Sequence, residues 1–136
     1  MNKERQTFFE RWVFQARRDL SAAAALHANG SDEWAIFLAH QAAERALKAF
    51  LYLKGERAIV GHSIRSLVHK CAHFASSFEV IHDAGKLDEL YVGPRFPDTF
   101  AAEIPADGAR PEDAGDAVEL ARMTVELVDK LAREEG

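Results

Sequence analysis

Three polar side chains, His40, Glu44 and Lys48, are spaced so that they could act together. Residues four apart lie one above the other on a helix, so these three form a continuous polar strip. Phe37 and Leu51 fall on the same side, which indicates that the strip faces another protein surface. An unpaired polar group buried there would cost about 1–3 kcal/mol. Two interpretations stay open: a network between helices or between subunits, and a ligand-binding site.

A second group of candidate residues surrounds a proline-rich segment. The sequence Tyr91-Val92-Gly93-Pro94-Arg95-Phe96-Pro97-Asp98 places a charged pair on a stiff turn beside aromatic rings. Arginine can hold a phosphate through two parallel hydrogen bonds, and Tyr or Phe can stack on a base. Arg95, Asp98 and Tyr91 are therefore candidate ligand-binding residues. The alternative is that Arg95 pairs with Asp98 or Glu44 and fastens the loop to the helices.

Metal and thiol chemistry are less favoured by the sequence. His69 and His73 are four apart and could share a metal ion on a helix face, but the Lys-Cys-Ala between them lacks the Glu of a zinc-protease motif. We interpret them as a surface pair and expect no metal and no cofactor. Cys71 is the single cysteine, which excludes an internal disulfide and indicates a reducing compartment. Its apolar register predicts a buried, unreactive thiol.

Composition limits the class of protein. The 136 residues fit one domain of ordinary size, and 48% hydrophobic with 29% charged residues indicate a folded, soluble chain. A net charge of −5 argues against nonspecific coating of DNA or acidic membranes, but it allows a local basic site. The charged N-terminus does not resemble a signal peptide, and no run approaches the ~20 apolar residues of a membrane span. We therefore expect a cytoplasmic protein with no membrane partner.

Helical periodicity dominates the first half of the chain. Apolar residues recur at three- and four-residue steps over about 3–28 and again over about 32–54. Asn29-Gly30-Ser31 and Gly55 provide the residues that end these helices. Asp19 projects into the apolar sector of the first helix beside Trp12. It is either a salt-bridged carboxylate at the edge of the core or a partner of the polar strip.

The second half predicts shorter helices and one long loop. Ser63 is the expected N-cap of a third helix, whose inward residues are Ile64, Leu67, Val68, Cys71 and Phe74. A fourth helix is predicted over 78–92, bent or interrupted at Gly85. All four prolines fall within a loop predicted over 93–111, and the last helix starts near Pro111. The chain is therefore predicted to be all-α: one up-and-down bundle of four to five helices over residues 1–136, with its core over about 11–130.

Four motifs occur in the order and spacing of one known family. They are Asp19-Leu20, Gln41-Ala42-Ala43-Glu44-Arg45-Ala46-Leu47-Lys48, His62-Ser63-Ile64, and Leu90-Tyr91 followed by Arg95-Phe96-Pro97-Asp98. In the last motif Phe96 replaces the usual Tyr. From about Arg11 to Lys130 the chain resembles a HEPN domain, a small all-helical domain often described as nucleotide-binding.

The resemblance implies three kinds of function. Many small prokaryotic members pair with a separate minimal nucleotidyltransferase in two-gene toxin–antitoxin modules. Several others are metal-independent ribonucleases with an Arg-x4–6-His motif, and others bind nucleotides or serve as interaction modules. After Arg95 the required His would stand at position 100, 101 or 102, which hold Phe, Ala and Ala. The one literal match, Arg57 to His62, lies between the second and third helices, and we expect His62 to orient or cap the third helix.

These observations favour an interaction module over an enzyme. The resemblance implies a component of a two-gene system with a minimal nucleotidyltransferase partner, and with a nucleotide or RNA bound near Arg95. A homodimer is expected because the second helix is largely apolar and because Trp12, Trp34 and several of the nine Phe residues exceed what one small bundle easily hides. We expect no ribonuclease activity that depends on the Arg95 loop. The alternative is a HEPN ribonuclease toxin with a nonstandard active site.

Overall fold

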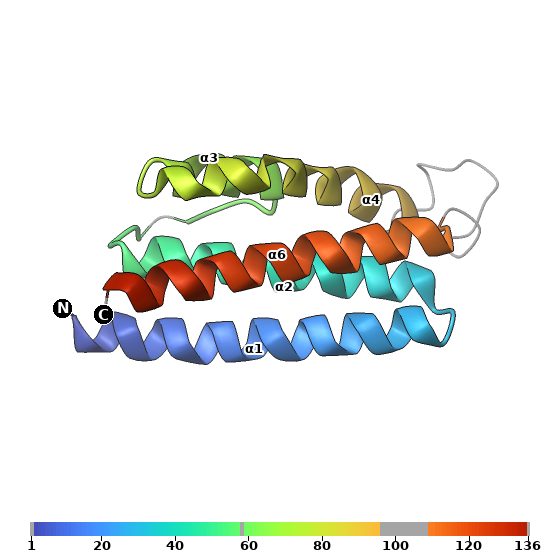
Figure 1. The fold of residues 1–136 in the computed structure, drawn as a ribbon, viewed down its shortest axis with the longest axis horizontal. Coiled ribbons are helices and arrows are strands. Elements are labelled where there is room, and N and C mark those ends of the chain that lie inside the picture. The colour runs from blue at the N-terminus through green and yellow to red at the C-terminus, as the bar shows by residue number, and fades with distance from the viewer. Residues whose placement is uncertain (1, 58, 96–108, 136) are drawn as a thin grey trace.

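The computed structural model describes residues 2–57, 59–95 and 109–135, with the side chains of 91–95 and 135 excepted, and every regular element in these ranges is a helix. The prediction of an all-α bundle is confirmed. Figure 1 shows the long helices α1, α2 and α6 side by side, with the shorter helices along one side of them. The elements are α1 (Lys3–Ala28), α2 (Asp32–Leu53), α3 (Ile64–Ala72), the 3-10 helix η1 (Ser76–Gly85), α4 (Lys86–Arg95) and α6 (Pro111–Glu135).

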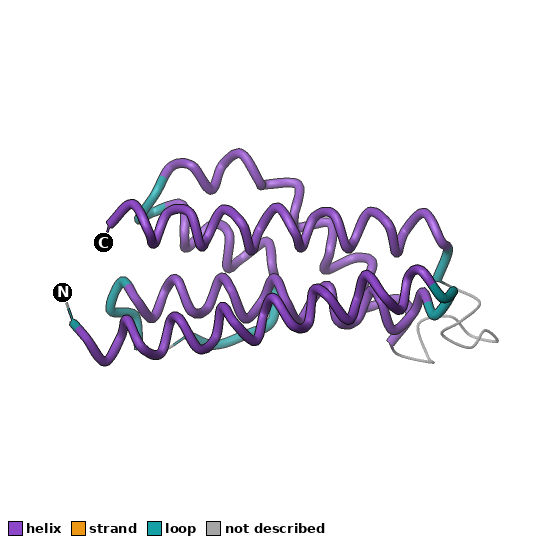
Figure 2. Tube along the Cα trace, turned by 60° about the horizontal axis from the view of Figure 1, so that its bottom comes forward, coloured by secondary structure: helices purple, strands orange, loops and turns teal. Residues whose placement is uncertain are grey.

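The bundle is elongated, and α1 begins at the same end at which α6 finishes (Figures 1 and 2). Within the described ranges, no helix combines the length and the apolar character that a membrane span requires.

Glycines end the first two helices as predicted. Gly30 follows α1 with φ of 87°, and the Ser31 N–H donates to the Leu26 carbonyl at 2.8 Å. Gly55 follows α2 with φ of 100°, and the Glu56 N–H donates to the carbonyl of Leu51 at 3.0 Å. These are Schellman ends, which need a residue that adopts positive φ without strain. The first of them turns the chain so that α1 and α2 form an antiparallel hairpin.

Helix α2 is the centre of the bundle and contacts α1, α3, α4 and α6. Small side chains on a helix let its neighbours approach closely. Phe50 fills part of the remaining space, with its ring centroid 4.9 Å from that of Phe78 in an edge-to-face arrangement. The fully or almost fully buried small residues of α2 are Ala35, Ala39, Ala42, Ala43, Ala46 and Ala49.

The helical segment predicted over 78–92, bent or interrupted at Gly85, is divided into two elements. It consists of η1, which is kinked at Ile81 with φ of −107° and ψ of 25°, followed by α4. The junction falls at Gly85, as predicted. A Cβ atom on Gly85 would lie 2.9 Å from Nε of Arg65, so any other residue here would displace that side chain on α3. Close packing explains the position of this glycine.

Two further predictions are wrong in detail. Phe74 was expected to face inward, but it is 42% exposed. Helix α3 ends at Ala72, and beyond a helix end the period of 3.6 residues no longer decides where a side chain points. A loop was predicted from residue 93, but residues 93–95 are helical because α4 continues to Arg95. Residues 96–108, which include Asp98, lie outside the described part of the chain.

Candidate functional site

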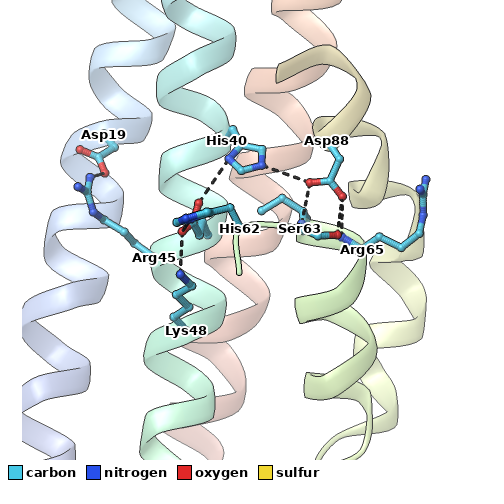
Figure 3. A network of polar contacts seen from close by, with 10 residues as sticks. Asp19, His40, Arg45, Lys48, His62, Ser63, Arg65 and Asp88 are labelled. Carbon is cyan, nitrogen blue, oxygen red and sulfur yellow. Dashed lines mark hydrogen bonds and ion pairs between the residues drawn. The ribbon is translucent and has the colours of Figure 1, made fainter. Parts of the chain in front are cut away.

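The polar strip of α2 is covered by the segment that leads into α3 (Figure 3). Glu44 joins the strip together: its Oε2 accepts a hydrogen bond from Lys48 Nζ at 2.8 Å and lies 2.7 Å from His62 Nδ1. His40 Nδ1 lies 3.6 Å from the other oxygen, Oε1. One carboxylate therefore serves three basic side chains from α2 and from the segment before α3.

The strip continues through His40 to Asp88 at the start of α4. His40 Nε2 lies 3.2 Å from Asp88 Oδ1. Asp88 also accepts hydrogen bonds from the backbone N–H of Ile64 at 2.7 Å, from that of Arg65 at 3.0 Å, and from Ser63 Oγ at 3.0 Å. The first N–H groups of a helix have no partner within that helix. Asp88 thus caps α3 from a different helix.

Ser63 has the capping role that the sequence predicts. Its backbone is extended, with φ of −75° and ψ of 118°, and its Oγ accepts a hydrogen bond from the Ser66 N–H at 3.2 Å. Ser63 and Asp88 together satisfy three N–H groups in the first turn of α3. The start of α3 is therefore fixed to α4, and through His40 to α2.

Exposure increases from His40 through Glu44 to the basic side chains that Glu44 holds. The side chain of His40 is 1% exposed, that of Glu44 10%, that of Lys48 28% and that of His62 77%. The inner end, at His40 and Asp88, connects three helices. The outer end presents an imidazole and an ammonium group to solvent, both held by Glu44.

The surroundings shift the pKa values of His40, Glu44 and Asp88. Burial lowers the pKa of His40 below its ordinary value, against the hydrogen bond to Asp88. Burial acts to raise the pKa of Glu44, but hydrogen bonds from Lys48 and His62 outweigh it, so the pKa is lowered. Asp88 behaves in the same way, because two backbone N–H groups of α3 bind its charged form. The network therefore favours a neutral His40 between two carboxylates.

Comparison with known proteins identifies the family. The model of the HEPN domain matches residues 9–131. The chain belongs to the HEPN domain family. Two solved structures of similar fold agree with this: TT1696 from Thermus thermophilus, at 33% identity and a TM-score of 0.82, and ST0689, described as an archaeal HEPN homologue, at 30% identity and a TM-score of 0.74. Each match covers 90% of this chain and 96% of the other. No functionally curated protein matches the chain.

This HEPN domain is expected to lose stability as the pH falls from 7 to 4. The folded-state pKa of His40 lies below its ordinary value of 6.5, so the unfolded chain binds that proton first and unfolding becomes easier below about pH 6.5. Glu44 and Asp88 have lowered folded-state pKa values. Their contribution is complete above their ordinary values of 4.5 and 3.8, and it is lost as the pH falls through the lowered values.

Urea unfolding at a series of pH values measures this effect. In the His40→Gln variant, the loss between pH 6.5 and 5 should become smaller, whereas the loss below pH 4.5 should remain. A midpoint that does not change between pH 7 and 4 in the unmodified protein would contradict the prediction.

The structure brings only part of the predicted candidate site together. His40, Glu44 and Lys48 form one cluster in the HEPN domain. Helix α4 runs antiparallel to α2, from Asp88 toward the end of the bundle where α2 begins (Figure 1). At 1.5 Å per residue, the backbone of Arg95 lies about 10 Å beyond Asp88 along α4, in the direction away from Lys48.

The remaining candidates of the proline-rich segment are described only in part. Tyr91 and Arg95 are helical residues of α4, but their side chains lie outside the described part of the structure, as does all of Asp98. A role for these three residues in binding stays a prediction.

Sequence reasoning missed Asp88 and the partner of His62. Asp88 is separated from Ser63 by 25 residues, so no helical spacing rule connects them. The available signal was the predicted N-terminus of α3, whose free N–H groups require an acceptor. His62 was noticed as part of a family motif, but its contact with Glu44 spans 18 residues and depends on the path of the chain after Gly55. Both contacts belong to the tertiary structure.

Asp19 and Cys71 both have structural surroundings that match a prediction from the sequence. Asp19, which is 6% exposed, forms an ion pair with Arg45 and accepts a hydrogen bond from Gln15 Nε2 at 2.9 Å, so the salt-bridged interpretation is confirmed. Cys71 is buried, and burial raises the pKa of its thiol to about 12, as expected for an unreactive thiol.

The histidine pair on α3 is a local ring contact. The ring centroids of His69 and His73 lie 5.1 Å apart in an edge-to-face arrangement. Across residues 2–57, 59–95 and 109–135, no group of three or more His, Cys, Asp or Glu side chains is arranged to hold a metal ion.

Proposed function

We propose that this protein is an interaction module: a HEPN homodimer that works with a minimal nucleotidyltransferase and binds a nucleotide or RNA. The observation that carries this proposal is the number of large apolar side chains left exposed in the described part of the chain. Exposed apolar groups of this size mark protein interfaces, in which aromatic residues are enriched. Apart from Trp12, which lines a groove between α1 and α2, they are Phe14, Trp34, Val60, Phe74, Val80 and Met123, with exposed fractions from 36% to 76%.

The polar network supports an interaction role for a different reason. The oxygens of Asp88 are occupied by α3 and His40, and those of Glu44 by basic side chains of the same chain. A group that is engaged in this way stabilises the fold and is less available for chemistry on a substrate. Lys48 and His62, at the exposed end, remain accessible to a ligand phosphate. Arg95, Asp98 and Tyr91 are the further ligand residues that we propose.

The exposed apolar side chains predict that the protein is a dimer at tens of micromolar. A specific dimer interface is expected to bury at least ~1,000 Å2. Analytical ultracentrifugation should show a species of twice the chain mass. Replacing Trp34 by Ala tests the aromatic group at the start of α2, where its ring lies 6.2 Å from that of Phe37. A chain that sediments only as a monomer over this concentration range would contradict the prediction.

Recovery from the native host tests the partner. The tagged protein is purified, and the accompanying proteins, nucleotides and nucleic acids are identified together. A minimal nucleotidyltransferase encoded beside this chain and enriched with it would support the proposal. Recovery of the chain without any nucleotidyltransferase would contradict it.

One observation favours RNA cleavage as a second candidate function. His62 is 77% exposed, and Glu44 contacts its Nδ1 at 2.7 Å. A carboxylate that holds one ring nitrogen leaves the other free to accept a proton, as a general base does. Growth arrest on expression that is relieved by His62→Ala would favour this function. Normal growth and intact RNA on expression would contradict RNA cleavage and support the interaction module.

A further inference from the structure

A groove of about 820 Å3 lies between the N-terminal half of α1 and the middle of α2, among residues that the proposed ligand site does not use. Phe8, Arg11, Trp12 and Gln15 line it from α1, and Arg45 lines it from α2. Figure 3 shows Arg45 directed to Asp19 on α1, on the other side of α2 from Asp88. The volume lies in the range of small-molecule sites, about 300–1,000 Å3.

Two aromatic rings of the groove, those of Phe8 and Trp12, form a row that continues beyond it to Tyr52. The ring centroids of Trp12 and Phe8 lie 5.8 Å apart, and those of Phe8 and Tyr52 lie 4.0 Å apart. The row therefore crosses from α1 to the last turn of α2. Trp12 is 39% exposed, so part of its indole is free for a planar ligand.

Guanidinium groups lie at both ends of the row. The Arg45 guanidinium lies 5.8 Å from the centroid of Trp12, and that of Arg57 lies 5.1 Å from the centroid of Tyr52. Arg57 Nη1 also donates to Tyr52 Oη at 3.0 Å. The ion pair with Asp19 holds Arg45 in a defined orientation. Both cations are thus positioned on aromatic rings before any ligand arrives.

We infer that this groove binds single-stranded nucleic acid, with a base stacked on Trp12 and backbone phosphates on Arg11, Arg45 and Arg57. Aromatic planes that alternate with cations match a strand in which bases alternate with phosphates. Stacking of this kind accepts any base, so the site is expected to bind without sequence preference.

The local charge agrees with this ligand. The groove and the aromatic row carry three positive side chains, Arg11, Arg45 and Arg57, and two negative ones, Glu4 and Asp19. The chain as a whole has a net charge of −5. Arg5 adds a fourth positive group nearby, beside Gly55 at the end of α2. A local excess of arginine on an acidic protein is a site for a polyanion.

The inference goes beyond the proposed function, because it assigns nucleic-acid binding to a second site whose residues lie outside the proposed ligand site. It requires neither the nucleotidyltransferase nor Arg95. Arg95→Ala therefore tests the ligand site of the proposed function, and substitutions in the groove test this one.

The two tryptophans of the chain allow a direct test. The Trp34→Phe variant retains Trp12 as its single indole, and the Trp12→Phe variant retains Trp34. Each is titrated with octauridylate and with octathymidylate while tryptophan fluorescence is recorded. Saturable quenching is expected only in the variant that keeps Trp12. A stronger effect of one oligonucleotide would identify the preferred polymer, and equal effects would show that stacking and phosphate contacts suffice.

Affinity measurements by anisotropy of labelled octauridylate complete the test. Trp12→Ala is expected to weaken binding at least tenfold. Arg11→Glu, on an exposed side chain, should weaken it similarly and reduce its dependence on salt. The matched charge reversal is Lys86→Glu, at an exposed side chain of α4 that does not line the groove, and it should leave affinity unchanged. Circular dichroism melting checks that each variant is folded.

Three results would overturn the inference. The first is the absence of saturable quenching of Trp12 by either oligonucleotide. The second is binding that survives Trp12→Ala and Arg11→Glu but is lost in Arg95→Ala, which would support the ligand site of the proposed function instead. The third is displacement of octauridylate by polyglutamate at equal charge concentration, which would show a surface for acidic protein segments.

Discussion

Replacing Asp88 with alanine is expected to lower the free energy of unfolding by about 2–4 kcal/mol. Loss of a helix cap costs about 0.5–2 kcal/mol, and hydrogen bonds to a charged group contribute about 1.5–3 kcal/mol. Asp88 accepts from two N–H groups of α3 and from Ser63 Oγ, and it contacts the buried imidazole of His40. All of these groups would lose their acceptor together.

Urea unfolding at pH 7 measures the change, with two comparisons. Asp88→Asn keeps an oxygen acceptor but removes the charge, so its effect should lie between those of the unmodified protein and of Asp88→Ala. Asp83→Ala removes a carboxylate whose side chain is 79% exposed and pairs with exposed His82, and it should change stability by less than about 0.5 kcal/mol. An Asp88→Ala protein as stable as the Asp83→Ala protein would show that the network contributes little to the fold.

Local chemistry was sufficient to predict most helix boundaries. Gly30 and Gly55 end α1 and α2 because their positive φ angles permit a Schellman turn, and this requirement is visible in the sequence. Ser63 at the start of α3 is a similar case, since its hydroxyl caps the helix that immediately follows. These features depend on residues within a few positions of one another, so a sequence pattern contains them.

The predictions that were wrong concern segments in which tertiary packing decides. The apolar residues of 78–92 fit a helix, but they do not distinguish an α-helix from the 3-10 geometry of η1. Phe74 fits the apolar period of α3, yet the helix ends before reaching it. Tertiary contacts also decide the composition of the polar network around Glu44. The strip of His40, Glu44 and Lys48 was visible as an i, i+4 pattern, whereas Asp88 and His62 reach it through contacts 48 and 18 residues apart.

The two sides of α2 have different roles in this interpretation. On one side, His40 and Glu44 connect α2 to α4 and to the segment before α3, mostly out of contact with solvent. On the other, Arg45 faces α1 and lines an open groove with Trp12. Neighbouring residues of one motif, Glu44 and Arg45, therefore point to different partners. A substitution at one is expected to change stability, and a substitution along the groove is expected to change binding.

Replacing Glu44 with alanine is expected to lower the free energy of unfolding by about 1–3 kcal/mol. Without the Glu44 carboxylate, Lys48 and His62 lose the anion that they share, and His40 loses a neighbouring charge. The loss of these interactions at a buried carboxylate accounts for the expected decrease in the free energy of unfolding. Glu89→Ala is the matched control, because its side chain is 71% exposed and lies 3.9 Å from Arg65, and exposed ion pairs contribute about 0–1 kcal/mol.

Lys48→Ala and His62→Ala separate a structural strip from a ligand site. His62 is mostly exposed and Lys48 partly so, and each keeps Glu44 paired with the other base, so each should cost less than about 1 kcal/mol. If the strip is structural, Glu44→Ala destabilises the protein more than either of these variants, and titration calorimetry with nucleotides gives the same affinity for all three. The opposite pattern, with unchanged unfolding and weaker nucleotide binding in each variant, would establish the strip as a binding site. Glu44 would then act by positioning Lys48 and His62 for a phosphate.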